Sequence, residues 1–176
     1  MNIIVKTTSM TATTGTLEIG GQSSECTLGR TGVASAQDKK EGDGKTPFGD
    51  YPLRQVFYNA PRVAKPETGL PVEILTPETG WCDDPKHADY NKQIKLPHPA
   101  SHESMMREDH LYDYVAVIGY NDDPIVAGKG SAIFMHLARP DFSPTAGCIG
   151  LRLEDLRAVL KLCDRSSRIK ILPPQP

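Results

Sequence analysis

The sequence predicts a mainly β fold, a curved β-sheet sandwich with one or a few helices. Fifteen glycines and fifteen prolines are many for 176 residues and indicate frequent turns. Most apolar residues fall in short runs of strand length, and only one stretch has a helical period. With 38% hydrophobic and 24% charged residues, the chain has enough apolar material for one core of ordinary size. A single domain over residues 1–176 is therefore expected.

The first strands are expected near the N-terminus, where short runs of β-prone residues are separated by glycine turns. A strand is predicted at Ile3 to Val5, a second in the segment TLEIG (16–20), and a third in CTLGRTGVA (26–34), with a bend at Gly29. Residues 51–58, YPLRQVFY, follow a turn rich in Gly, Asp and Pro. Their aromatic and β-branched side chains predict another strand.

The middle of the chain, about residues 60–110, has many Pro, Asn, Asp and His residues and little periodicity beyond VEIL (72–75). It is expected to be an irregular insertion or cap with short helical turns. Long loops in compact domains are usually functional or disordered. We therefore expect this segment to cover a cleft, with Tyr90, Asn91 and residues 101–103 in the cap.

Regular patterns return in the last third of the chain. The apolar runs DYVAVIGY (113–120) and GSAIFMHL (130–137) predict two central strands, and RIKIL (168–172) predicts a closing strand. Residues 151–163 predict the one clear helix, because Leu153, Leu156, Leu160 and Cys163 fall on one helical face. That spacing places Cys163 in the core.

The charge balance excludes some classes of partner. Twenty basic against twenty-two acidic residues, without an extended basic tract, give little support to nucleic-acid or anionic-membrane binding. No apolar run approaches the roughly 20 residues that span a bilayer, so no membrane span is expected. The N-terminal residues lack the pattern of an export signal. A cytoplasmic location, another export route and a removed signal all remain open.

Cys148 and His136 form the most informative pair. His136 ends a predicted strand, and Cys148 lies in the sequence TAGC just before the predicted helix. A nucleophilic thiol needs a base, and backbone N–H groups beside a flexible Gly147 could bind the oxyanion. A cysteine activated in this way is expected to react at mildly acidic pH. The alternative is that Cys148 is a buried structural cysteine, as Cys163 is expected to be. None of the four cysteines forms a CxxC pair, and one disulfide among Cys26, Cys82 and Cys163 remains open in an oxidising compartment.

The sequence resembles the L,D-transpeptidase (YkuD-type) catalytic domain. His136 matches the upstream histidine of that family, and Thr145, Gly147 and Cys148 match its [S/T]HGC motif. In EGDGKTPFGDY (41–51) a second motif, TPxGxY/F, is matched. Several further tracts look most like the YafK-like proteobacterial branch. Two departures, Ala146 for the motif histidine and Gly150 for the usual Arg or Asn, bear on substrate fit more than on thiol chemistry.

The resemblance implies acyl transfer on peptidoglycan stem peptides. Cys148 would attack the carbonyl at diaminopimelate and release the terminal D-amino acid, with His136 as the base and no metal or organic cofactor. An acceptor amine would give a cross-link, and water would make the chain an L,D-carboxypeptidase or endopeptidase. A non-catalytic peptidoglycan-binding module with an inert cysteine is the third possibility. The family role in wall synthesis and cell shape implies the periplasm, with the cytoplasm as the alternative.

Substrate contacts are expected from residues that suit a peptide with several carboxylates. The charged candidates are also explained as solvated surface side chains. Asp83 and Asp84 would contact the amino group of diaminopimelate or end a turn. His87, His98, His102 and His110 have spacings that match no closed zinc site, so no metal centre is predicted. The substrate-binding candidates are Thr145, Arg152, Arg30, Lys45, Tyr90 and Asn91, with Lys39 and Arg107 as further cations.

Overall fold

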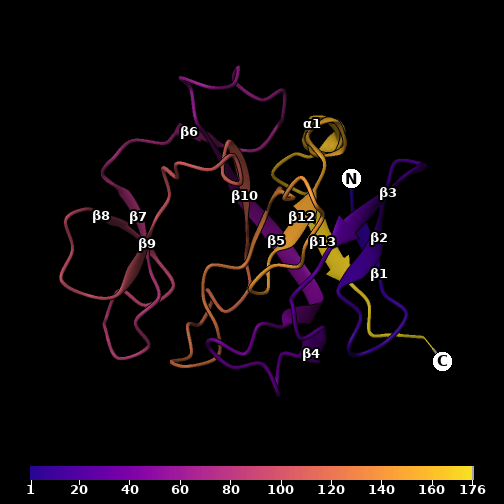
Figure 1. The fold of residues 1–176 in the computed structure, drawn as a ribbon, viewed down its shortest axis with the longest axis horizontal. Coiled ribbons are helices and arrows are strands. Elements are labelled where there is room, and N and C mark those ends of the chain that lie inside the picture. The colour runs from indigo at the N-terminus through magenta and orange to yellow at the C-terminus, as the bar shows by residue number, and fades with distance from the viewer. Residues whose placement is uncertain (176) are drawn as a thin grey trace.

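The computed structural model describes residues 1–175 and confirms a mainly β fold (Figure 1). Among the described residues there are thirteen strands and one helix. In chain order they are β1 (Ile3–Lys6), β2 (Thr14–Ile19), β3 (Gln22–Thr27), β4 (Val33–Ser35), β5 (Thr46–Tyr58), β6 (Val72–Ile74), β7 (Thr79–Cys82), β8 (Gln93–Lys95), β9 (His102–Ser104), β10 (Tyr114–Ile118), β11 (Phe134–Leu137), β12 (Ile149–Leu151), α1 (Leu153–Leu162) and β13 (Arg168–Ile171).

The main sheet is mixed and strongly curved. Its strands follow the order β10-β11-β12-β3-β2-β1-β13-β5-β4, and β5 also pairs with β10, so the sheet closes on itself. The long strand β5 makes this possible, because its first part pairs with β13 and its second part, from Leu53 to Tyr58, pairs with β10. The register shifts between Ala116 and Ile118, a bulge that helps a strand to bend.

The middle segment is more regular than predicted. Instead of short helical turns, it contains a three-stranded antiparallel sheet in the order β8-β7-β9, at the left in Figure 1. No helix forms between residues 60 and 110. Each of these strands has only three or four residues. Such strands are too short to show an alternating pattern, and pairing between distant segments creates them.

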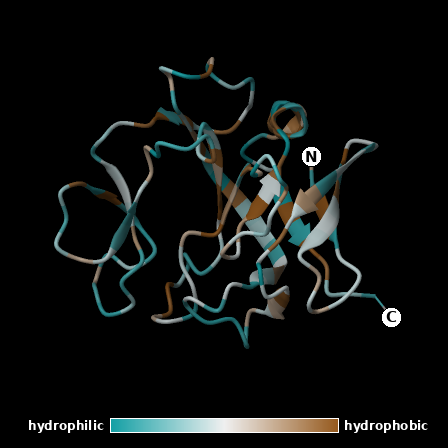
Figure 2. Ribbon diagram, viewed as in Figure 1, coloured by the Kyte–Doolittle hydropathy of each residue, from teal (hydrophilic) through white to brown (hydrophobic). Residues whose placement is uncertain are grey.

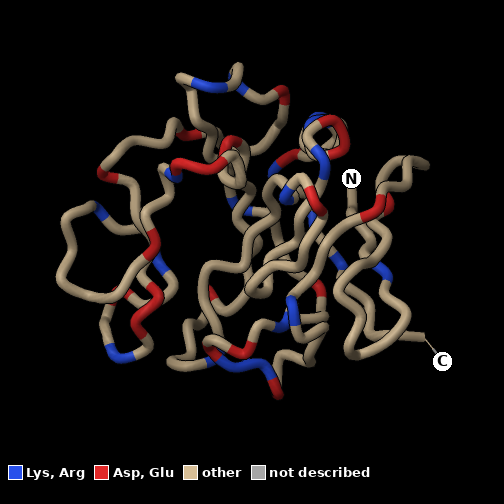
Figure 3. The backbone as a smooth tube through the Cα atoms, viewed as in Figure 1, with Lys and Arg blue, Asp and Glu red and all other residues tan. Residues whose placement is uncertain are grey.

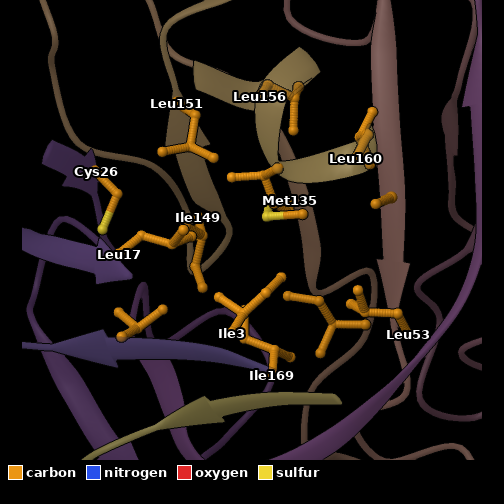
Figure 4. Close-up of a cluster of buried hydrophobic side chains, with 14 of the residues drawn as sticks. Ile3, Leu17, Cys26, Leu53, Met135, Ile149, Leu151, Leu156, Leu160 and Ile169 are labelled. Carbon is orange, nitrogen blue, oxygen red and sulfur yellow. The ribbon is translucent and has the colours of Figure 1, made fainter. Parts of the chain in front are cut away.

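Two hydrophobic clusters lie on opposite faces of the central strands. In β10, Tyr114, Ala116 and Ile118 point into the larger cluster, which we call the main core, and Val115 and Val117 point into the second core. Part of the main core is shown in Figure 4, and the hydrophobic segments of the curved sheet are brown in Figure 2. Both faces are buried, which explains why this strand is a continuous apolar run.

Helix α1 confirms the predicted helix. Its buried residues Leu156, Val159 and Leu160 pack into the main core, and Cys163 at its end lies there too. Acidic residues in the first turn and Lys161 in the last turn suit the helix dipole. No helix in the described part of the chain has the length and apolar character needed to span a bilayer.

Two predicted strands are shorter than expected. The single strand predicted at residues 26–34 is two strands: β3 ends at Thr27, and β4 begins at Val33. A turn through Gly29 and Gly32 separates them. The strand predicted at residues 130–137 begins only at Phe134, because Ala132 has a positive φ of 53° that a strand does not allow. This irregular approach to β11 forms part of the candidate site.

Candidate active site

His136 is held in the middle of the main sheet, with one ring nitrogen free to accept a proton. It pairs with Val115 of β10 and with Gly150 of β12. Its Nδ1 lies 2.8 Å from the Leu137 carbonyl oxygen. A carbonyl only accepts, so Nδ1 carries the hydrogen and the neutral ring leaves Nε2 with its lone pair. Burial lowers the His136 pKa to about 4, which keeps the ring neutral at pH 7.

Cys148 lies next to β11 because it directly precedes β12, the parallel neighbour of that strand. Its Sγ accepts a hydrogen bond from the Phe134 N–H at 3.4 Å and donates one to the Ala132 carbonyl at 3.3 Å. Burial, with a smaller contribution from the Glu103 carboxylate, raises the Cys148 pKa to about 12. The resting cysteine is therefore a thiol, so we do not expect this state to show the acid-pH reactivity predicted from the sequence.

The loop before Cys148 needs glycine and threonine at two matched motif positions. Gly147 has φ of 134°, and a Cβ there would lie 2.8 Å from the Lys45 carbonyl oxygen. Thr145 Oγ1 donates to the Cys148 carbonyl at 2.6 Å and accepts from the Gly147 N–H at 3.1 Å. That amide is thus engaged in this conformation, so an oxyanion would need the other N–H groups around Cys148.

Cys148 and His136 line the same cavity, which has a volume of about 490 Å³. Two of the substrate-binding candidates, Arg30 and Thr145, also line it, as do the further cations Lys39 and Arg107. Lys39 is only 2% exposed and pairs with Asp43 at 2.7 Å, so it is a buried part of the wall. The cavity thus brings together the two residues that the sequence predicts for thiol chemistry.

Four of the substrate-binding candidates lie outside the cavity lining. Arg152 is exposed, pairs with Glu25 at 3.2 Å and stacks over the Phe142 ring. Tyr90 and Asn91 are buried, and their side chains bond to protein groups. Lys45 approaches the site only through its backbone carbonyl, beside Gly147.

Tyr112 and Glu103 are wall residues whose place in the cavity the sequence did not reveal. The Tyr112 hydroxyl donates to Glu103 Oε1 at 2.9 Å, and its ring lies edge-on to His136 with centroids 5.3 Å apart. Burial raises the pKa of the Glu103 carboxyl. The sequence predicts no role for Tyr112 and places Glu103 only within the cap. Pairing of β9 with β7 brings Glu103 to the wall, which the sequence alone does not show.

The cavity wall carries both signs of charge. Glu41, Asp83 and Glu103 are its acidic side chains, while Arg139 adds a cation that sequence analysis missed. Asp83 also accepts a hydrogen bond from the Ser101 hydroxyl at 2.7 Å. Charges of both signs are likewise interspersed along the whole chain in Figure 3. Such a wall suits a ligand that has both carboxylate and ammonium groups.

Two of the four histidines considered above, His87 and His98, come together with an aspartate. Possible metal-ligand atoms of His87, Asp89 and His98, ring nitrogens and a carboxylate oxygen, lie within 4.8 Å of one another. His87 Nδ1 accepts the Asp89 N–H at 3.1 Å, and His98 Nδ1 accepts the Ala100 N–H at 3.2 Å. His98 Nε2 then carries the hydrogen that it donates to Asp89. These bonds occupy the groups that a metal ion would need, so the arrangement favours a hydrogen-bonded cluster.

No curated protein matches the sequence. Two crystal structures of the helical cell shape determining protein Pgp2 from Campylobacter jejuni, one of them a point mutant, are similar at 18% identity, with TM-scores of 0.45 and 0.44. The alignments cover 99% of this chain and 48% of those, so the chain spans about half the length of these proteins.

The family comparison covers most of the sequence. The sequence profile of YkuD, the L,D-transpeptidase catalytic domain, matches residues 3–171. This range includes both matched motifs, the cavity and the two sheets. The YafK-like branch is not distinguished by these matches and stays a prediction. The chain belongs to the YkuD family of L,D-transpeptidase catalytic domains.

Proposed function

We propose that this chain transfers acyl groups between peptidoglycan stem peptides through a thioester on Cys148, with His136 as the general base. One observation carries the proposal: both side chains line one cavity, and the hydrogen bond from Nδ1 leaves Nε2 of His136 able to accept a proton. The family membership supplies the substrate class. We therefore expect the chain to act on the cell wall, in the periplasm.

The resting pair is a neutral thiol and a neutral imidazole in one cavity, because burial disfavours both charged forms. In this state the thiol proton points at the Ala132 carbonyl. We propose that bound substrate redirects it to His136 Nε2 as sulfur attacks the peptide carbonyl. The proton transfer is then coupled to bond formation, which is general-base catalysis.

The complete reaction balances with this pair alone. Sulfur forms a bond to the carbonyl carbon, the C–N bond to the terminal D-amino acid breaks, and His136 returns the proton to the leaving amine. An acceptor amine then attacks the thioester, His136 removes its proton, and the thiol is restored as the cross-link forms. The acidic side chains Asp83 and Glu103 in the same wall suit an acceptor that arrives as an ammonium ion and releases one proton to solvent before it attacks.

Mass spectrometry of muropeptides tests the proposal. Purified protein incubated with disaccharide tetrapeptides is expected to produce cross-linked dimers, and Cys148→Ala is expected to produce none. Cys163→Ala is the matched control, because that thiol is also buried but lies in the main core. Trimmed monomers without dimers would identify a hydrolase of the same thiol chemistry. Products that persist in Cys148→Ala, or no products with folded protein, would contradict the proposal.

A further inference from the structure

Ala132 has an unusual backbone conformation directly beside the proposed nucleophile. Its φ of 53° lies in the left-handed region, which disfavours any residue with a Cβ. It is buried, and its carbonyl oxygen accepts the Cys148 thiol hydrogen at 3.3 Å. A conformation of this kind persists only where surrounding groups hold it. The position of the thiol therefore depends on whatever holds Ala132.

Asn91 is the side chain that holds the Ala132 backbone. Its Oδ1 accepts the Ala132 N–H at 3.0 Å and the Trp81 indole N–H at 3.0 Å. Its Nδ2 donates to the carbonyls of Tyr120 and Asn121, at 3.0 and 2.8 Å. Both acceptor positions and both donors of the amide are used, so its orientation is fixed. At 5% exposure, the side chain is shielded from competing water.

The neighbouring residue strengthens the same attachment. Tyr90 accepts the Gly130 N–H at 2.9 Å through its hydroxyl oxygen and donates to Glu41 at 3.0 Å. Glu41 in turn accepts from the Ser131 hydroxyl at 2.8 Å. Residues 130–132 are thus bound at successive positions by side chains from two other segments. The end of the segment between β10 and β11 is therefore held by Tyr90 and Asn91 of the middle segment together with Glu41.

We propose that Asn91 is a positioning residue, which keeps Ala132 in its left-handed conformation and so aims the Ala132 carbonyl at the Cys148 thiol. The inference rests on the proposed function in treating Cys148 as the nucleophile. Asn91 does not line the cavity and acts only through Ala132. This gives Asn91 a different role from the substrate contact expected from the sequence.

The test follows the pH dependence of Cys148 alkylation by iodoacetamide, read by peptide mass spectrometry. The variant is Asn91→Gly, because Asn91 itself has φ of 56° and glycine accepts that conformation without strain. The Ala132 carbonyl stabilises the neutral thiol, so its displacement favours the thiolate. The midpoint of alkylation is expected to fall by about one pH unit, the equivalent of one hydrogen bond.

A second substitution separates positioning from general destabilisation. In an Ala132→Gly background the left-handed conformation carries no Cβ strain, so residue 132 keeps its place without help from Asn91. Ala132→Gly alone is expected to leave the midpoint unchanged, and the double variant is expected to recover most of the shift. If Asn91→Gly alone does not fold, recovery of the fold in the double variant supports the same role.

Asn59 provides the matched control, since it is a buried asparagine with 3% exposure and lies outside the cavity lining. Asn59→Gly is expected to leave the alkylation midpoint unchanged, whatever its effect on stability. An unshifted midpoint in folded Asn91→Gly would overturn the inference, as would a double variant that recovers neither the midpoint nor the fold. Alkylation needs no substrate, so this result is independent of whether the chain transfers or hydrolyses acyl groups.

If cross-linking activity is found, the kinetic constants of the Asn91 variant provide a second test of the positioning role. Asn91→Gly is expected to lower kcat by about 10- to 100-fold with little change in KM, because the nucleophile is misplaced while the charged side chains of the cavity wall are unchanged. A change confined to KM would contradict a positioning role.

Discussion

The main core and the second core use the same strands for different purposes. In the main core, β10 and β11 contribute Tyr114, Ala116, Ile118 and Met135, which meet the apolar face of α1. The opposite face of these strands meets the inserted segment, where Cys148 packs with Phe134, Trp81 and Tyr112. One face stabilises the sheet, and the other places a thiol beside polar groups that must all be satisfied.

This difference shows how the fold separates the residues that stabilise it from those of the proposed active site. The main core contains apolar side chains from nearly every strand of the curved sheet, so no single loop defines it. The second core depends on particular hydrogen bonds, such as those of Asn91 and Tyr112, and on two positive φ angles, at Ala132 and Gly147. Substitutions on the two faces are therefore expected to have separable effects.

The largest effect is expected from Gly147→Ala, which changes the loop beside the second core. A Cβ at this φ of 134° is strained and would lie 2.8 Å from the Lys45 carbonyl oxygen, so the loop must shift. A displacement of about 1 Å at a nucleophile typically lowers rates about 100-fold. Cross-linking rates should fall by at least this factor. Wild-type rates in a folded Gly147→Ala protein would show that the loop geometry is not required.

A substitution in the main core is expected to do the reverse. Leu160→Ala removes a fully buried side chain from the helix face and should reduce the free energy of unfolding by about 2–5 kcal/mol. The cavity lies on the other face of the sheet, so the pH midpoint of Cys148 alkylation should not move. Urea denaturation and alkylation profiles together measure both. A shifted midpoint would show that the two cores are coupled.

The pH dependence of stability is a smaller test of the second core. The folded pKa of His136, about 4, is below its ordinary value of 6.5, so the unfolded chain binds the proton more readily. This contribution to stability is complete above pH 6.5 and is lost as the pH falls through about 4. In His136→Gln, the urea concentration at the unfolding midpoint should depend less on pH between pH 6.5 and 4. The pKa values of Asp43 and Asp109 are lowered from 3.8, so these carboxyls change the stability only below about pH 3.8. They should not affect the stability between pH 6.5 and 4. An equally steep decline in the variant would contradict a neutral buried imidazole.

The smallest effect is expected from Arg152→Ala, at the surface. Its ion pair with Glu25 is exposed on both sides, and such pairs contribute about 0–1 kcal/mol. Stability should change by less than about 1 kcal/mol, and cross-linking should change little because Arg152 lies outside the cavity lining. A large loss of activity with unchanged stability would support the prediction from the sequence that Arg152 contacts the substrate.

The sequence was sufficient to predict those strands and helices that have a clear apolar pattern of their own. Strand β10 and helix α1 have clear apolar patterns, and the order His136, Thr145, Gly147, Cys148 was sufficient to indicate the family. The sheet of β7, β8 and β9 could not be predicted, because its strands are short and their partners are distant in sequence.

The contacts around the site could not be predicted from the sequence, because they too join residues that are distant in the chain. The contact of Asn91 with Ala132 joins residues 41 positions apart, and nothing in either residue's neighbours signals it. The left-handed Ala132 lies within an apolar run that reads as strand, so a local pattern gives the wrong structure at that position. Only the packing of the middle segment on the main sheet determines both.

The decisive experiment for the proposed mechanism is detection of an acyl-enzyme on Cys148. Protein mixed rapidly with a disaccharide tetrapeptide and quenched in acid is analysed by intact mass and by peptide mapping. We predict an adduct on Cys148 equal to the disaccharide peptide without its terminal D-amino acid. This adduct should be absent in Cys148→Ala and released by hydroxylamine. Turnover of the substrate without any adduct on Cys148, or an adduct on another cysteine, would contradict the proposed mechanism.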